Sequence, residues 1–190
     1  MKSIFSIHAG EYLLGLELEK RLHKKPYNKP CNVWVPGKDY GIDLLVTDKK
    51  TNKKAAALQA KFSKDYAPMQ GVLAGGWWTF DLKKMKDSPA EFWVLVLYAL
   101  QQQKSHFIII EPSVLLSKIR FLRSNRKSKV NFYLWINRHK ECYATRDLPV
   151  EEQNIIANGK KGAYKKSKAY NPNRDFNSFY EDFKSIAKLL

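Results

Sequence analysis

Hydrophobic positions recur at helical spacing in three parts of the chain, and each part predicts a helix. The first helix is expected over residues 10–24, where leucines recur at every fourth position from Leu14. The second is expected over residues 112–124, with a proline at its first position. The third is an amphipathic helix over residues 173–190, which we expect to pack on the core.

Short apolar runs bounded by Gly, Pro or charged turns predict strands. Two continuous runs, residues 92–99 and 106–111, are typical of strands buried on both faces. For residues 63–89, which include Trp77 and Trp78, the pattern predicts only short helix and loop. The other expected strands cover residues 32–35, 42–47, 55–62, 130–137 and 141–145. The order of elements predicts an α/β fold, with a mixed central β-sheet flanked by helices in a single domain over residues 1–190.

A polar turn at residues 48–54 separates two of these strands and sets their pairing. A hairpin with its turn centred on Thr51 pairs residues whose numbers sum to 102, so Asp43 lies opposite Gln59. Side chains two apart in a strand point to one face, so Lys61 joins Gln59 there. The hairpin therefore brings an acid, an amide and an amine to one point on the sheet.

Metal-assisted hydrolysis of phosphodiesters uses such a set of groups. Mg²⁺ prefers oxygen ligands and usually takes one or two carboxylates together with waters and phosphate. Asp43 would be the main ligand, with the side-chain oxygen of Gln59 and the backbone carbonyl of Ala60 as weaker ligands. The ammonium group of Lys61 would steady the attacking water or the charge that develops on phosphorus.

The order of these residues resembles the PD-(D/E)XK nuclease superfamily, the restriction-endonuclease-like fold. The family pattern is a helix bearing a Glu, a strand with an Asp, and a strand with (Asp/Glu)-X-Lys. It is matched by Gly10-Glu11-Tyr12, Gly41-Ile42-Asp43 and Gln59-Ala60-Lys61. Gln59 replaces the usual acid, and this Gln-X-Lys form resembles the Mrr-like branch of restriction and DNA-repair nucleases.

The resemblance covers the first third of the chain and implies several properties. It implies a restriction-endonuclease-like core and a Mg²⁺ cofactor, for which Mn²⁺ can substitute. Because Gln59 is neutral, the resemblance makes Glu11 the second carboxylate ligand beside Asp43. Each acid also has an ordinary alternative, since Asp43 could pair with a lysine of the hairpin and Glu11 could simply favour the start of a helix.

The charge balance adds a polyanionic partner to this picture. The 190 residues hold 34 Lys and Arg against 18 Asp and Glu, a net charge of +16. Acids are missing from residues 20–38, 112–140 and 153–174. Phosphate contacts from such stretches give strong, salt-dependent binding to nucleic acid. The cations that we expect to bind nucleic acid are Arg126, Lys127, Lys160, Lys161, Lys165 and Lys166.

Aromatic residues near these cations suggest contacts with DNA. The last four cations lie in residues 159–172, which we predict to be a flexible basic loop, where Tyr164 and Tyr170 suit base or backbone contact. Trp77 and Trp78 could stack on bases, although such pairs more often lie at least half within a core.

Several other function classes lack their sequence features. The four histidines show no zinc-ligand spacing, and the chain has neither a Walker-type motif nor GxGxxG. Its longest apolar run, residues 92–100, is too short to cross a bilayer, so no membrane partner is expected. The two cysteines, Cys31 and Cys142, are far apart and make no CxxC, which favours a reducing, cytoplasmic compartment.

Together these features predict a Mg²⁺-dependent DNA endonuclease of a restriction, defence or repair type, acting on double-stranded DNA. A two-fold homodimer would cut both strands most simply. Two alternatives stay open at this point. One is a catalytically inactive nucleic-acid-binding module on the same fold, which the neutral Gln59 keeps in view. The other is a basic RNA-binding domain unrelated to nucleases.

Overall fold

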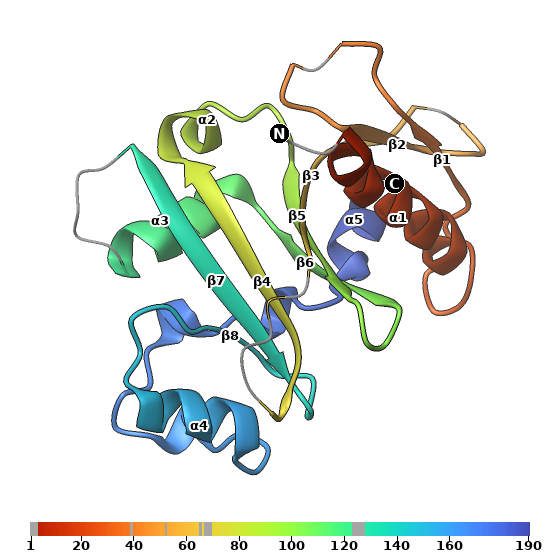
Figure 1. The fold of residues 1–190 in the computed structure, drawn as a ribbon. Coiled ribbons are helices and arrows are strands. Elements are labelled where there is room, and N and C mark those ends of the chain that lie inside the picture. Colours follow the sequence, from red (N-terminus) through yellow and green to blue (C-terminus); the bar gives the residue numbers. More distant parts are fainter. Residues whose placement is uncertain (1–3, 39, 52, 65, 67–69, 123–127) are drawn as a thin grey trace.

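Two β-sheets packed against each other form the frame of the protein (Figure 1). The structure is a computed structural model that describes residues 4–38, 40–51, 53–64, 66, 70–122 and 128–190. The first sheet has five strands in the order β1-β2-β3-β5-β6, and the second has three in the order β4-β7-β8. The strands are β1 (Cys31–Trp34), β2 (Leu44–Asp48), β3 (Ala55–Lys64), β4 (Val72–Asp81), β5 (Phe92–Ala99), β6 (Lys104–Ile110), β7 (Lys129–Asn137) and β8 (Cys142–Ala144).

Helices flank both sheets. In the first sheet β3 and β5 are parallel and the other neighbours are antiparallel, so the sheet is mixed. The predicted α/β class with a mixed central sheet is thereby confirmed. The helices are α1 (Ile4–Leu22), α2 (Leu82–Lys86), α3 (Pro112–Leu122), α4 (Val150–Asn158) and α5 (Phe183–Leu189), and short 3₁₀ turns are η1 (Tyr164–Lys166), η2 (Pro172–Arg174) and η3 (Asn177–Phe179).

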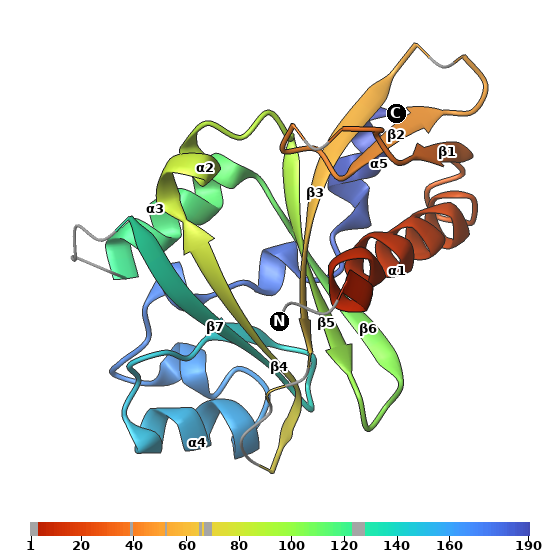
Figure 2. The same ribbon diagram turned by 45° about the horizontal axis from the view of Figure 1, so that its top comes forward.

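The first sheet separates two apolar cores. On one face, the stripe of Leu14, Leu18 and Leu22 on α1 is fully buried with α5 against the sheet. On the other face, Trp93 and neighbouring β5 residues pack against the inner face of the second sheet and against α3. Figure 2 shows α1 and the second sheet on opposite sides of β3 and β5. Strand β5 is therefore buried on both faces, as its continuous apolar sequence predicts.

Helix α1 comes unusually close to β3 at Gly10. A Cβ atom at this position would lie 2.7 Å from the Cβ of Phe62, nearer than side-chain carbons normally approach. Glycine therefore lets the first half of α1 rest directly on the last part of β3. This contact fixes where the neighbouring residue, Glu11, stands relative to the sheet.

The second sheet and the C-terminal region differ from the prediction. Residues 63–89, expected to be short helix and loop, contribute the end of β3, the ten-residue strand β4 and helix α2. The single helix expected over residues 173–190 is replaced by η2, η3 and a shorter α5. The apolar spacing misled here because Phe176 is buried from an irregular segment, packing against Phe132 with a ring separation of 5.4 Å.

Candidate functional site

The pairing of β2 with β3 has the predicted register. Leu44 lies opposite Leu58 and Leu45 opposite Ala57, so paired numbers sum to 102. Asp43 directly precedes β2, and its backbone N–H donates to the carbonyl of Leu58 at 2.9 Å. The same register therefore places Asp43 across from Gln59.

The carboxylate of Asp43 lies at the edge of β3. Its Oδ2 accepts a hydrogen bond from the backbone N–H of Ala60 at 2.8 Å. If the pairing of β2 and β3 continued, that N–H would donate a hydrogen bond to the backbone of the residue before Asp43. The Asp43 carboxylate accepts this hydrogen bond instead. A strand directs the N–H and C=O of one residue to the same side, so the Ala60 carbonyl also faces the Asp43 side of β3.

Gln59 and Lys61 project from the sheet face that meets the second sheet. Both are partly exposed, and in the parallel pairing they stand beside Trp93 and Leu95 of β5. The ammonium nitrogen of Lys61 lies 5.2 Å from the Trp93 ring centroid, a cation–π contact. The Lys61 backbone is also held, because the indole Nε1 of Trp78 donates to its carbonyl at 2.8 Å.

Glu11 is positioned from the other side of the sheet. It lies on α1, which packs on the face opposite Gln59 and Lys61, and its Oε2 is 3.1 Å from Nδ1 of His8. The structure thus brings Asp43, Gln59, Ala60 and Lys61 together on two adjacent strands. It places Glu11 on the helix side of the same strand, next to the Gly10 contact with Phe62.

Glu91 is a further carboxylate near β3, and no motif in the sequence indicates it. Glu91 directly precedes β5, and its Oε2 accepts the backbone N–H of Ala57, while its own N–H donates to the Ala57 carbonyl at 2.9 Å. Ala57 is two residues before Gln59 on the same strand. Glu91 also lines an open cavity of about 470 Å³ between α2, β5 and the start of α3.

The oxygen donors around Asp43 suit a hard cation with few protein ligands. They are the Asp43 carboxylate and the neighbouring Ala60 carbonyl, to which the side chain of Gln59 on the same strand would add an amide oxygen, and Mg²⁺ completes such sets with waters and phosphate. Within the part of the chain that the structure describes, no cluster of three or more His, Cys, Asp or Glu side chains has the form of a metal site. A cation held here would therefore depend on Asp43 as its principal charged ligand.

The predicted nucleic-acid-binding cations of residues 159–172 lie away from this site. Arg126 and Lys127 fall outside the described residues. Figures 1 and 2 show α4 and the segment after it at the end of the second sheet that is remote from β2. That segment carries four exposed lysines: Lys160, Lys161, Lys165 and Lys166.

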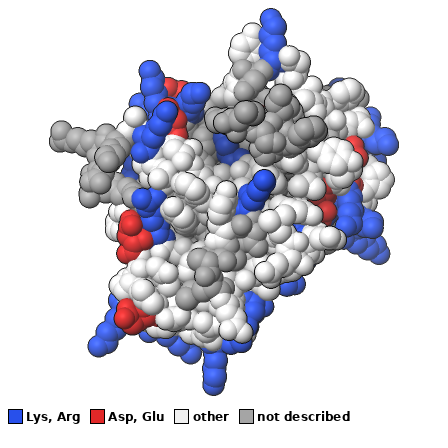
Figure 3. All heavy atoms as spheres, in the orientation of Figure 1, with Lys and Arg blue, Asp and Glu red and all other residues white. Residues whose placement is uncertain are grey.

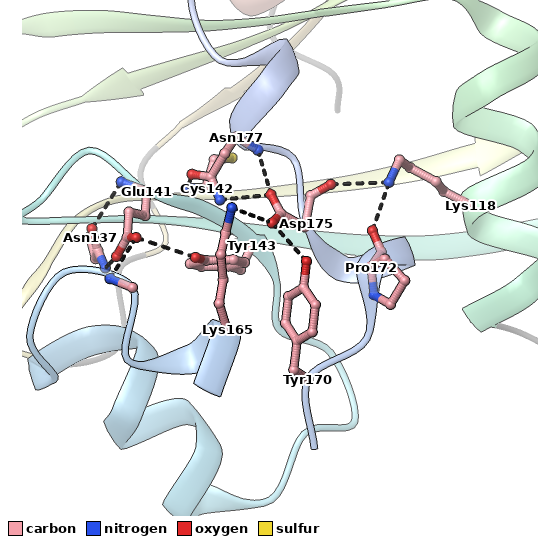
Figure 4. A network of polar contacts seen from close by, with 11 residues as sticks. Lys118, Asn137, Glu141, Cys142, Tyr143, Lys165, Tyr170, Pro172, Asp175 and Asn177 are labelled. Atoms are coloured by element: carbon pink, nitrogen blue, oxygen red, sulfur yellow. Dashed lines mark hydrogen bonds and ion pairs between the residues drawn. The ribbon is translucent and has the colours of Figure 1, made fainter. Parts of the chain in front are cut away.

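A polar network fastens this basic segment to the second sheet (Figure 4). Lys165 pairs with the Asp175 carboxylate at 3.1 Å, and the Tyr170 hydroxyl donates to the same group at 3.1 Å. The Asn177 side chain donates to Asp175 at 2.7 Å and accepts the backbone N–H of Cys142 in β8. The segment predicted to be a flexible loop thus contains η1 and is tied to β8, and one of its lysines serves in an internal ion pair.

The protonation of Asp175 reflects this network. Burial by itself would raise the pKa of the carboxyl, but hydrogen bonds from Asn177 and the ion pair with Lys165 outweigh burial. The pKa of Asp175 is therefore held below its usual range, and the side chain is a carboxylate at neutral pH. On its other side, Lys118 donates to the backbone carbonyls of Asp175 and Pro172 at 3.0 and 2.9 Å.

The aromatic candidates separate into buried and exposed residues. Tyr164 is buried, with its ring centroid 5.0 Å from that of Tyr143, so the expectation that it contacts nucleic acid is wrong. Trp78 is also buried, at 5% exposure, in the core between the sheets. Trp77 is 41% exposed on the outer face of β4. The two adjacent tryptophans therefore face opposite sides of the second sheet.

Comparisons with known proteins find no relative for the chain. No protein-family model matches it, and no match is found among curated proteins or among solved structures. Across the described residues, no helix combines the length and the apolar character needed to cross a bilayer.

Proposed function

We propose that the protein is a Mg²⁺-dependent endonuclease that hydrolyses phosphodiester bonds of DNA. The observation that carries the proposal is the pairing of Asp43 with the Gln59-Ala60-Lys61 segment. The Asp43 carboxylate accepts the Ala60 N–H, and Gln59 and Lys61 flank Ala60 on β3, in the order that resembles the PD-(D/E)XK pattern. The net charge of +16 supports a polyanionic substrate.

The residues divide the chemistry between them. Asp43, Gln59 and the Ala60 carbonyl would hold the cation. Glu11 lies on α1, on the opposite face of the sheet from Gln59 and Lys61, and is not assigned to this cation. When bound, Mg²⁺ supplies Lewis-acid activation of the phosphoryl group and of the attacking water. The Lys61 ammonium would orient that water or stabilise the negative charge that develops on phosphorus. Two copies related by a two-fold axis would bring one such site to each strand of a duplex.

Metal dependence is the direct test of this function. Supercoiled plasmid incubated with the protein should be nicked or linearised in Mg²⁺ or Mn²⁺, and adding a chelator should stop the reaction. Gel electrophoresis of the plasmid over time measures the rate. Intact plasmid under every metal condition, together with undiminished DNA binding, would instead identify an inactive nucleic-acid-binding module.

Exchanging Gln59 for Glu should strengthen metal binding. The substitution adds a second negative charge opposite Asp43, and a charge within about 4 Å of the cation should lower the half-saturating Mg²⁺ concentration by about tenfold. The measurement is the cleavage rate as a function of Mg²⁺ concentration. Gln101→Glu makes the same charge change in the exposed turn between β5 and β6, and it should leave the Mg²⁺ dependence unchanged. Equal effects of the two variants would count against Gln59 as a ligand.

A further inference from the structure

Three aromatic side chains, two exposed and one partly exposed, form a cluster at the outer face of the second sheet. We call Tyr66, Trp77 and Tyr133 the aromatic platform. Trp77 of β4 and Tyr133 of β7 are cross-strand partners, and their rings stack with a centroid distance of 5.7 Å and an interplanar angle of 8°. The Tyr66 ring meets Trp77 edge-on at 5.8 Å. Tyr66 is 51% exposed and Trp77 41% exposed.

The alternation of side chains along the strands explains why these rings face outward. Trp78 and Phe132, which flank them in sequence, point into the core between the sheets. Among the described residues, helix α4 and η1 pack on the part of the outer face near Trp135 and Tyr143 and not on the part around Trp77. The uncovered part holds the aromatic platform, and it continues past it through Thr79, whose hydroxyl hydrogen-bonds Asn131 at 2.8 Å.

The charge around the platform suits a ligand with flat rings and phosphates. The guanidinium of Arg146 lies 5.2 Å from the Tyr133 ring centroid, and Lys129 is exposed at the end of β7. In Figure 3, which has the orientation of Figure 1, the surface drawn over β4 and β7 is mainly uncharged, with more Lys and Arg than Asp and Glu around its edges. Nucleic-acid bases stack on exposed aromatic rings while the backbone phosphates reach nearby cations.

The platform also adjoins the candidate site. The backbone N–H of Trp77 donates to the Ser63 hydroxyl at 2.9 Å. Ser63 is two residues after Lys61 on the same strand, a separation of about 7 Å along β3. Because Trp77 faces outward and Lys61 faces the space between the sheets, a nucleic-acid strand would pass around the edge strand β4 to reach Lys61 from the platform.

We propose that the aromatic platform stacks the unpaired bases of single-stranded DNA, so that the substrate of the candidate site carries a single-stranded segment. The binding part of this proposal stands on the geometry of Tyr66, Trp77 and Tyr133. The part that concerns the substrate rests on the proposed function. Each base that stacks on an aromatic ring contributes to the binding free energy. Removing one ring should therefore weaken single-strand binding by about five- to a hundredfold.

The test measures binding without cleavage. A fluorescent oligothymidylate and a blunt duplex of equal length are titrated with protein in chelator, and anisotropy gives the affinities. Trp77→Ala and Tyr66→Ala should weaken single-strand binding as stated and change duplex binding much less. The slope of affinity against salt concentration should stay at the wild-type value, because no phosphate contact is removed. Trp34→Ala is the matched control, since Trp34 is 53% exposed on β1.

Tryptophan fluorescence gives a second readout. Oligothymidylate should quench the emission of the wild type and of Trp34→Phe, and Trp77→Phe should lose most of that quenching. Wild-type affinity in both alanine variants, or unchanged quenching in Trp77→Phe, would overturn the platform. A change from dimer to monomer in Trp77→Ala would overturn it as well, by assigning this face to contacts between copies of the chain.

The same protein preparations separate this proposal from the proposed function. In the Asp43→Asn background, Trp77→Ala should weaken oligonucleotide binding by the same factor as in the wild type, because Asp43 is not a platform residue. Binding that depends on Trp77 without metal-dependent cleavage would keep the platform and reject the nuclease. Metal-dependent cleavage without any effect of Trp77 or Tyr66 on binding would keep the nuclease and reject the platform.

Discussion

Replacing Asp43 with Asn should lower the rate of Mg²⁺-dependent DNA cleavage by at least about a thousandfold. Asn keeps a side-chain oxygen that can accept the hydrogen bond from the Ala60 N–H, so this backbone group of β3 keeps its partner. The substitution removes the negative charge of the side chain that we propose as the principal metal ligand. The rate of plasmid nicking at saturating Mg²⁺ is the measurement, with thermal unfolding as the check that the fold is kept.

The matched control for this experiment is Asp87→Asn. Asp87 is exposed and follows α2, where its backbone N–H caps the helix, so the substitution changes the same charge without touching the site. It should cleave like the wild type. If Asp43→Asn retained wild-type cleavage, the metal site would be excluded. If Asp87→Asn lost as much activity as Asp43→Asn, net charge and not a specific ligand would account for both.

Replacing Lys61 with Met should lower the cleavage rate by about a hundred- to a thousandfold, the usual cost of losing one group that stabilises charge in the transition state. Methionine keeps an unbranched stem that can still lie against Trp93, so the loss concerns the ammonium and not packing. The loss should appear in kcat, while the Mg²⁺ concentration for half-maximal rate stays near its wild-type value. Single-turnover cleavage of a labelled DNA gives both quantities.

Lys64→Met is the companion variant because Lys64 is an exposed lysine on the same strand, pointing to the opposite face. Removing its charge should weaken DNA binding slightly and leave kcat unchanged. Equal losses of kcat in the two variants would show that Lys61 acts only through the overall positive charge.

The position of the candidate site could be predicted because it depends on local chemistry. The polar turn between β2 and β3 is closed by Asp48, whose Oδ2 accepts the N–H and the hydroxyl of Thr51 at 3.0 and 2.6 Å. Contacts among neighbours in sequence therefore fix the register, and the register aligns Asp43 with Gln59. The same holds for β5, whose residues 92–99 are buried on both faces and read as a strand without any tertiary information.

The second sheet could not be predicted because its signals contradict its structure. Gly75 and Gly76 read as turn residues, yet they lie in the middle of β4. A Cβ at Gly76 would be 2.1 Å from Cη2 of Trp78, so the glycine makes room for an indole that folds back over the strand. Glycine is required at this position only because Trp78 is buried, and no neighbouring residue in the sequence indicates that burial. Tyr133, the cross-strand partner of Trp77, lies on β7, far along the chain, so the sequence did not predict the aromatic platform either.

The hairpin of β2 and β3 has a consequence for the order of folding. Its strands are joined by a short turn, and hairpins of this kind form within microseconds. Trp93, which the Lys61 ammonium contacts, and Tyr133, which stacks on Trp77, come from strands further along the chain. Such long-range contacts form later because more chain entropy is lost in making them. Asp43, Gln59 and Ala60 should therefore be aligned early in folding, before the second sheet encloses Lys61 and creates the surface on which we expect DNA to lie.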